Sequence, residues 1–171
     1  MDEKNYLISI GENNLSRVHE WTKAADQKAG FTLTIAIALL GVSLSMISET
    51  IKVVTESISR GQGYWLLIAF IVIVFLAYIF LGIRAIWLLV SVVKPRIIPT
   101  TKRESILFFG SIAKMELEYF KEKMRSLDHD TLLNELSDQT YVSSEIAAIK
   151  YQYLHQAFNS LSYAFLAGFI A

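Results

Sequence analysis

The sequence predicts an all-α membrane protein, chiefly because it contains two long apolar segments. Gly30 to Ile47 carries no charged residue, and Tyr64 to Val93 carries only Arg84. A helix that crosses the ~30 Å hydrocarbon layer of a bilayer needs ~20 mainly apolar residues, so both segments approach or exceed the required length. The composition agrees: 53% of the residues are hydrophobic, the mean hydropathy is +0.40, and only two prolines and eight glycines interrupt the chain.

The first apolar segment follows a polar N-terminal region, residues 1–28. Asn5 to Lys28 is expected to be helical and to lead directly into a first transmembrane helix at 29–48, because Leu15, Val18, Trp21 and Ala25 form one stripe. The apolar run begins about thirty residues into the chain, behind charged residues, which is not the pattern of a cleavable signal peptide.

The second apolar segment follows an expected external loop at 49–63 and forms a transmembrane helix at 64–93 with a cytoplasmic extension. Tyr64 and Trp65 are expected to form an aromatic belt at one interface, which places Arg84 near the other, where its stem can snorkel to the headgroups. Ala85 to Val93 would then pass beyond the membrane and need a protein partner. Pro95 and Pro99 are expected to end this helix.

Lysine and arginine counts predict the orientation. Residues 1–28 hold four, Ile47 to Gly63 holds two, and Lys94 to Lys150 holds nine, so the N-terminal region and the middle region (94–150) are expected to be cytoplasmic. The formal net charge is zero and the pI is near 6.8, which gives no footprint for a nucleic acid polymer.

The middle region and the tail are also expected to be helical. Ser105 to Ile112 is a short apolar run for which no second strand is available, and Met115 to Arg125 is amphipathic. Asp128 is a good N-cap for one long helix. Its last part, 151–171, is expected to form a third span, although an interfacial or re-entrant helix is the alternative, since the strongly apolar part from Leu161 is too short to cross alone.

Several stretches, in this order, resemble a known family. They are ADQKAG at Ala25 to Gly30, FFGSIAKMELEYF at Phe108 to Phe120, and SLDHDTLLNELSDQTYVSSEIAAIKYQYLHQAF at Ser126 to Phe158, which enters the last apolar helix. This pattern resembles the transmembrane Pycsar effectors of bacterial antiphage defence, and the similarity covers nearly the whole chain.

The resemblance implies a function at the bacterial inner membrane. A pyrimidine nucleotidyl cyclase encoded beside the effector makes cyclic UMP or cyclic CMP on infection, and the effector impairs or permeabilises the membrane, causing abortive infection. The expected partners are the bilayer, further copies of the chain and the cyclase, with no cofactor. The rival reading is a membrane-anchored interaction module that recruits or restrains a cytosolic partner without opening a path.

Small and polar residues at helical spacing predict close helix packing or a pore lining in the spans. Small residues let helices approach closely in lipid, and a polar side chain at membrane depth needs a partner or water. Either packing within the chain or an interface between copies would use these positions, which are Thr34, Ala38, Gly41, Ser45, His155, Asn159, Ser160, Ala164 and Gly168.

A site for a cyclic mononucleotide needs a cation or backbone N–H groups for the phosphate, an aromatic ring for stacking, and amide or hydroxyl groups for the base. Residues of these types in the cytoplasmic part are Arg103, Gly110, Lys114, Gln139, Tyr141, Lys150 and Tyr151. Each of them is also compatible with a solvated surface or an amphipathic interface, and none forms a recognised nucleotide motif.

Two juxtamembrane charges, Asp26 and Lys28, have two readings. They either anchor a helix end at the membrane or act as a switch that pairs with the Arg84 or Lys150 region, and the resemblance places them in a family motif. Catalysis is not expected, because the chain has no cysteine, its three histidines lie far apart in sequence, and no serine stands in a nucleophile-elbow context.

Overall fold

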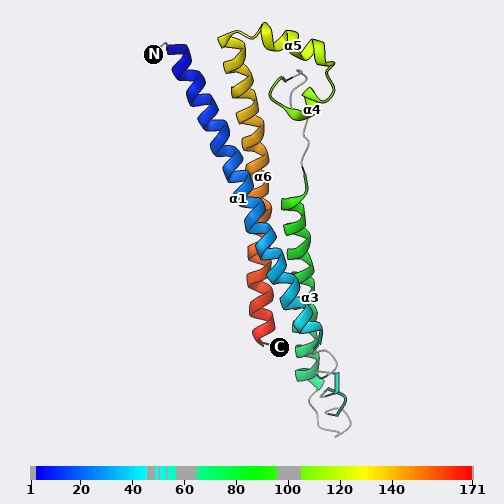
Figure 1. Cartoon of the computed structure of the whole chain (residues 1–171). Helices are drawn as coiled ribbons and strands as arrows, with labels where there is room; N and C mark the ends of the chain where they lie inside the picture. Colours follow the sequence, from blue (N-terminus) through cyan, green and yellow to red (C-terminus); the bar gives the residue numbers. More distant parts are fainter. Residues whose placement is uncertain are drawn as a thin grey trace. The chain divides into compact units, whose positions relative to one another are not determined.

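The computed structural model describes residues 3–45, 49, 51–52, 54–56, 65–95 and 105–170 (Figure 1). Its elements are the helices α1 (Glu3–Ser45), α3 (Trp65–Val93), α4 (Phe109–Ile112), α5 (Leu117–Arg125) and α6 (His129–Ile170). No strand occurs within these ranges, which confirms the all-α prediction for the described part of the chain. Tyr64, Pro99, Arg103 and most of the expected loop 49–63 lie outside it.

The two longest helices follow the sequence-based boundaries. α1 is continuous for 43 residues, so the polar N-terminal helix leads without a break into the first apolar segment, as predicted. α6 begins directly after Asp128, whose Oδ1 accepts a 2.7 Å hydrogen bond from the backbone N–H of Thr131. This bonding to Thr131 lowers the pKa of the Asp128 carboxyl. The predicted N-cap is therefore confirmed.

The chain divides into two compact units, each of which contains part of α1 and part of α6. The first comprises Met1–Ala25 with Pro95–Lys150, and the second comprises Asp26–Lys94 with Tyr151–Ala171. In the first unit α1 and α6 run parallel: Lys4 Nζ lies 2.9 Å from Asp130 Oδ2, and a Cβ added at Gly11 would lie 3.3 Å from the Leu136 Cβ. These contacts join α1 to α6 at corresponding heights along the two helices of the first unit. Its buried apolar residues are Val18, Ala25, Ile106, Leu136, Val142 and Ala147.

A buried polar cluster fixes the segment before α4 onto α6 in this unit. The Ser105 hydroxyl donates to Glu135 Oε2 at 2.7 Å and accepts from Gln139 Nε2 at 3.1 Å. The same oxygen lies 3.1 Å from the backbone nitrogen of Leu107 and 3.2 Å from that of Phe108, and both N–H groups donate to it. One serine oxygen thus connects two side chains of α6 with two backbone groups ahead of α4.

The second unit packs α3 antiparallel to α1. A Cβ at Gly82 would lie 2.8 Å from Leu40 Cδ2, and the Ser43 and Tyr78 hydroxyl oxygens are 2.6 Å apart. α6 also reaches α3, because a Cβ at Gly168 would lie 3.2 Å from the Tyr78 ring. Small residues predominate in the buried positions, which allows close helix approach. These positions are Ala29, Ala36, Ala85, Leu88, Leu89, Val92, Leu154, Ala157, Ser160 and Ala164.

The end of α3 has its partner within the chain. Ala85, Leu89 and Val92 are completely buried, and Leu88 is nearly so. The expectation that Ala85 to Val93 would require a separate protein partner is therefore wrong for this face. Pro95 follows α3, which ends at Val93 as expected from the missing N–H of proline.

One described stretch, Ile68–Val93, is long and apolar enough to cross a membrane. Its large outward side chains include Phe80 and Trp87, which are 67% and 73% exposed. Crossing by the apolar parts of α1 and α6 stays a prediction.

Candidate functional site

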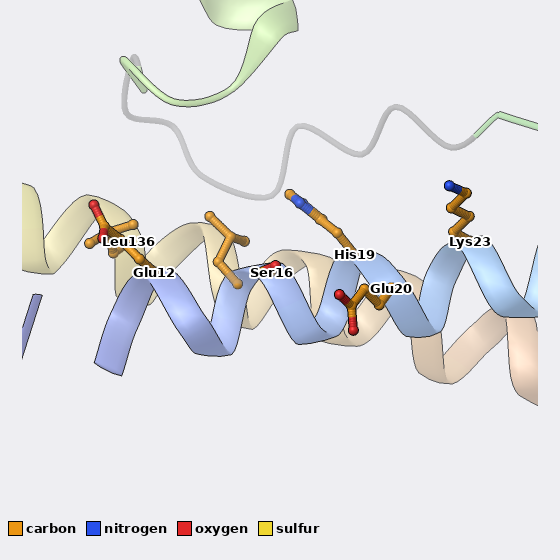
Figure 2. Close-up of a pocket in the computed structure, with 7 residues that line it drawn as sticks. Glu12, Ser16, His19, Glu20, Lys23 and Leu136 are labelled. Carbon is orange, nitrogen blue, oxygen red and sulfur yellow. The ribbon is translucent and has the colours of Figure 1, made fainter. Parts of the chain in front are cut away.

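A shallow groove in the first unit is lined mainly by polar side chains. It has a volume of ≈ 390 Å³ and is lined by Glu12, Leu15, Ser16, His19, Glu20 and Lys23 of α1 and by Leu136 of α6. Figure 2 shows the polar side chains following one another along α1, with His19 and Lys23 directed to the same side of the helix. Their spacing of three or four residues explains this alignment.

The groove offers complementary hydrogen-bonding groups. Lys23 is a cation for one negative charge, and Ser16 and His19 can donate to or accept from hydroxyl groups. Glu12 and Glu20 are carboxylates that accept hydrogen bonds from amino or imino groups. No group of three histidine, cysteine, aspartate or glutamate side chains within the described ranges could hold a metal ion. With two carboxylates and one lysine the groove has a formal charge of −1, so the anionic group of a ligand would have to bind at Lys23 and away from Glu12 and Glu20.

The nucleotide-site residues predicted from the sequence do not gather at this groove. Gln139 is buried and bonded to Ser105, and Lys150 is 5% exposed and engaged in an interaction of its own. Lys114 and Tyr141 are exposed, and Tyr151 belongs to the second unit. A Cβ at Gly110 would lie 2.7 Å from Phe108 Cε1, so the close approach that this glycine permits is made by a ring of the same chain. Arg103 lies outside the described residues.

The small-residue stripe of α6 is buried within the chain, whereas the stripe of α1 is exposed. In α6, Ser160 and Ala164 are buried and Gly168 meets the Tyr78 ring, so this stripe packs within the chain. In α1, Thr34, Ala38 and Gly41 are exposed, and a Cβ at Gly41 would meet no atom within 4 Å. The side chain of Ser45 lies outside the description. The stripe of α1 is thus left free for other contacts.

Of the remaining predicted polar residues of the spans, His155 and Asn159 are exposed, whereas Ser160 is buried. Asn159 Nδ2 lies 3.2 Å from His155 Nε2, so these exposed side chains bond to each other. Ser160 instead donates to the Gln156 carbonyl oxygen at 3.0 Å. Lys28 is exposed, Asp26 is half-buried, and Arg84 forms no hydrogen bond or ion pair with any described residue. The reading of Asp26 and Lys28 as an anchor or as a switch with the Arg84 or Lys150 region stays a prediction.

None of the groove residues is among the nucleotide-site residues predicted from the sequence, because those predictions concerned the region 94–151. The signal was a polar stripe at positions 12, 16, 19, 20 and 23, which lies on the helix face beside the apolar stripe that includes Leu15. On a sequence alone, such a stripe cannot be distinguished from an ordinary solvated face.

Comparison with known proteins identifies related chains. A family model described as the Pycsar effector protein domain matches residues 11–171. The chain is similar to the Pycsar effector protein GmPycTM of Gulbenkiania mobilis, with 27% identity over 162 residues, which cover 86% of this chain and 82% of that protein. No solved structure shows significant similarity.

Proposed function

Because this chain belongs to the Pycsar effector family, which acts in antiphage defence with cyclic pyrimidine signalling, we propose that it senses cyclic UMP or cyclic CMP and then permeabilises the inner membrane. The nucleotide comes from a pyrimidine nucleotidyl cyclase of the same defence system. Loss of the membrane barrier stops the infected cell before phage mature. The proposal includes no catalytic step and no cofactor.

The exposed apolar surface of α3 is the observation that carries the membrane part of this proposal. One face of Ile68–Val93 packs within the chain, but the other is exposed, and its large side chains include Trp87 and Phe80. A soluble monomer rarely exposes such a surface, whereas lipid accommodates it. The apolar part of α1 and the last part of α6 belong to the same unit as α3, which favours their insertion with it as the two further spans.

The outward stripe of α1 supports association of several copies. Thr34, Ala38 and Gly41 are small and exposed, so a second helix can approach them closely. In each copy the small residues of α6 are packed inside the second unit. A path across the bilayer would therefore form between copies. The N-terminal region and the middle region remain cytoplasmic, in agreement with their lysine and arginine content.

The groove of α1 supports direct nucleotide binding by this chain. In this proposal Lys23 binds the cyclic phosphate, and Ser16 and His19 bind the ribose hydroxyl. Glu12 or Glu20 would accept from the N4 amino group of cytosine or the N3–H of uracil. For a switch to result, the nucleotide must bind the permeable state more tightly than the resting state.

A liposome assay tests this function. The purified protein is reconstituted in dye-loaded vesicles, and cyclic UMP, cyclic CMP, cyclic AMP and cyclic GMP are added separately. Dye release with one pyrimidine nucleotide alone is the expected result. Binding of the nucleotide without release would contradict permeabilisation and favour the recruiting module.

An exposed apolar face on α5 is what keeps the recruiting module as the second candidate. Leu117 and Met124, which are seven residues apart and so share one face, are exposed large side chains on this short helix of the first unit. If the protein acts by recruitment, Leu117→Ser with Met124→Ser should abolish toxicity in cells. If it acts by permeabilisation, the same double variant should release dye as the wild type does.

A further inference from the structure

Arg84 is the only charged residue in α3, and its side chain is exposed on a helix that otherwise presents apolar groups outward. Its neighbours one turn away are Phe80 and Trp87, both of which are also exposed. Because no described residue bonds to Arg84, its charge is not compensated within the described part of the chain. The depth of this residue in the bilayer therefore decides what it can do.

The apolar stretch of α3 extends far on both sides of Arg84. Lys94 stands ten residues after Arg84, which corresponds to about 15 Å of helix. In the other direction the apolar stretch continues for sixteen residues to Ile68, which corresponds to about 24 Å. A hydrocarbon layer of ~30 Å that ends near Lys94 therefore has Arg84 about halfway across it.

The register of α1 gives the same depth independently. Leu40 lies against Gly82, and α1 is antiparallel to α3, so Arg84 is about level with Ala38. Lys28 is ten residues before Ala38, which is about 15 Å, and the charge-free run of α1 continues beyond that level to Ile47. Arg84 thus lies deeper than the interface position expected from Tyr64 and Trp65, and its stem is too short for full snorkelling.

Small or polar groups lie outward at the level of Arg84 on both other helices. Ala38 and Gly41 of α1 are exposed there. On α6, Gly168 is level with Tyr78, and α6 runs antiparallel to α3 (Figure 1), so exposed Ser162 is about level with Arg84, and exposed Asn159 follows one turn away. Water and ions brought to this level would meet small and hydrogen-bonding groups.

We propose that Arg84 lines the path that opens across the bilayer between copies of this chain, and that its fixed charge makes the leak select small anions over cations. A guanidinium at this depth needs water or an anionic partner, and rings of arginine or lysine are a known means of anion selection. This inference rests on the proposed permeabilising function. It adds the class of ion that the path conducts.

A depth measurement tests the placement without requiring a leak. The chain has no cysteine, so a single Ile83→Cys variant, which keeps Arg84, can carry a fluorescent label on an exposed neighbouring position. The label should be quenched most by a nitroxide in the middle of the acyl chains. A Lys94→Cys label serves as the control and should respond most to a headgroup nitroxide. A headgroup response at position 83 would overturn the placement.

A reversal-potential measurement tests selectivity on the full-length protein in planar bilayers. With a KCl gradient and the nucleotide that triggers the leak, the wild-type potential should move toward the chloride equilibrium potential. Arg84→Lys should retain this shift, Arg84→Gln should lose it, and Arg84→Glu should reverse it. Arg17→Gln, which changes an exposed arginine of the first unit, should leave it unchanged.

The outcomes separate the two proposals. A leak without anion preference, or the same potential in wild type and Arg84→Gln, would overturn the role of Arg84 and leave permeabilisation standing. Absence of any leak with a mid-bilayer label at position 83 would overturn permeabilisation, and the anion path with it, while the depth of Arg84 would stand.

Discussion

The hydroxyl groups of Ser43 and Tyr78 lie 2.6 Å apart and join α1 to α3, and the ring of the same tyrosine faces Gly168 of α6. Tyr78, which lies on α3, thus contacts both α1 and α6. It does so between the small, closely packed residues of the second unit.

Tyr78→Phe removes the hydroxyl but keeps the ring against Gly168. We expect the free energy of unfolding to fall by about 0.5–1.5 kcal/mol, the usual net contribution of one hydrogen bond. Ser43→Ala should have a similar effect, and the double variant should be little worse than either single one. Thermal unfolding in detergent, followed by circular dichroism, measures this. Tyr163→Phe, at an exposed tyrosine of α6, is the control; equal losses in both phenylalanine variants would contradict the assignment.

The two glycines of the opposite stripes should respond differently to leucine. Gly168→Leu drives a side chain into the Tyr78 ring and should lower the unfolding temperature of the isolated protein. A Cβ added at Gly41 would meet no atom within 4 Å. Gly41→Leu should therefore leave the unfolding temperature nearly unchanged while reducing association between copies. Cross-linking in liposomes measures association. Unaltered cross-linking in Gly41→Leu would exclude this face of α1 as the interface.

Ser105→Ala should destabilise the first unit. It removes the hydrogen-bond partner of buried Glu135 and Gln139 and of two backbone N–H groups. Leaving buried polar groups unsatisfied costs about 1–3 kcal/mol each in the absence of water, so a loss in this range or above is expected. Ser137→Ala, at an exposed serine of α6, is the matched control and should be nearly neutral. Thermal unfolding that is equal in the two variants would count against the cluster.

Asp128 makes stability depend on pH in a defined direction. Its hydrogen bonds with Thr131 lower the pKa of the carboxyl in the folded state, so the ionised cap stabilises the protein above the pKa of the unfolded chain. This contribution is lost as the pH falls through the folded value. Asp128→Ala should therefore unfold at a lower temperature than wild type near neutral pH, and the gap should narrow below about pH 4. Asp138→Ala, at an exposed aspartate within α6, should show no such narrowing.

Lys23 should contribute to nucleotide affinity if the groove is the binding site. Loss of one charge-assisted contact to a phosphate is expected to weaken binding by about 1.5–3 kcal/mol, or roughly tenfold to a hundredfold. Isothermal titration of Lys23→Gln with cyclic UMP and cyclic CMP measures this. Lys114→Gln is the control: it removes another exposed lysine of the same unit, so the two variants have the same net charge. The groove would be ruled out if only the Lys114 variant lost affinity.

The helices could be predicted from the sequence because their signals are local. Asp128 marks the start of α6, Pro95 follows the end of α3, and the stripe containing Val18 and Ala25 continues into the apolar run of α1. These features depend on neighbours within one or two turns. They fixed the boundaries to within a few residues wherever the structure describes them.

The direction in which each residue faces could not be predicted, because it depends on contacts between distant segments. Gly41 and Gly168 look alike in the sequence, yet one is uncovered and the other meets Tyr78. Gln139 appeared suited to reading a base, but Ser105, 34 positions earlier, bonds to its amide. The level of Arg84 relative to Ala38 likewise follows from the contact of Leu40 with Gly82, which no periodicity reveals.

The bond between Asn159 and His155 also occupies one side of the Asn159 amide. An amide nitrogen can only donate, so Asn159 Nδ2 donates to His155 Nε2. The carbonyl oxygen of Asn159 then keeps its lone pairs for an outside group. A neighbouring molecule that reaches this edge of α6 therefore meets a hydrogen-bond acceptor at Asn159.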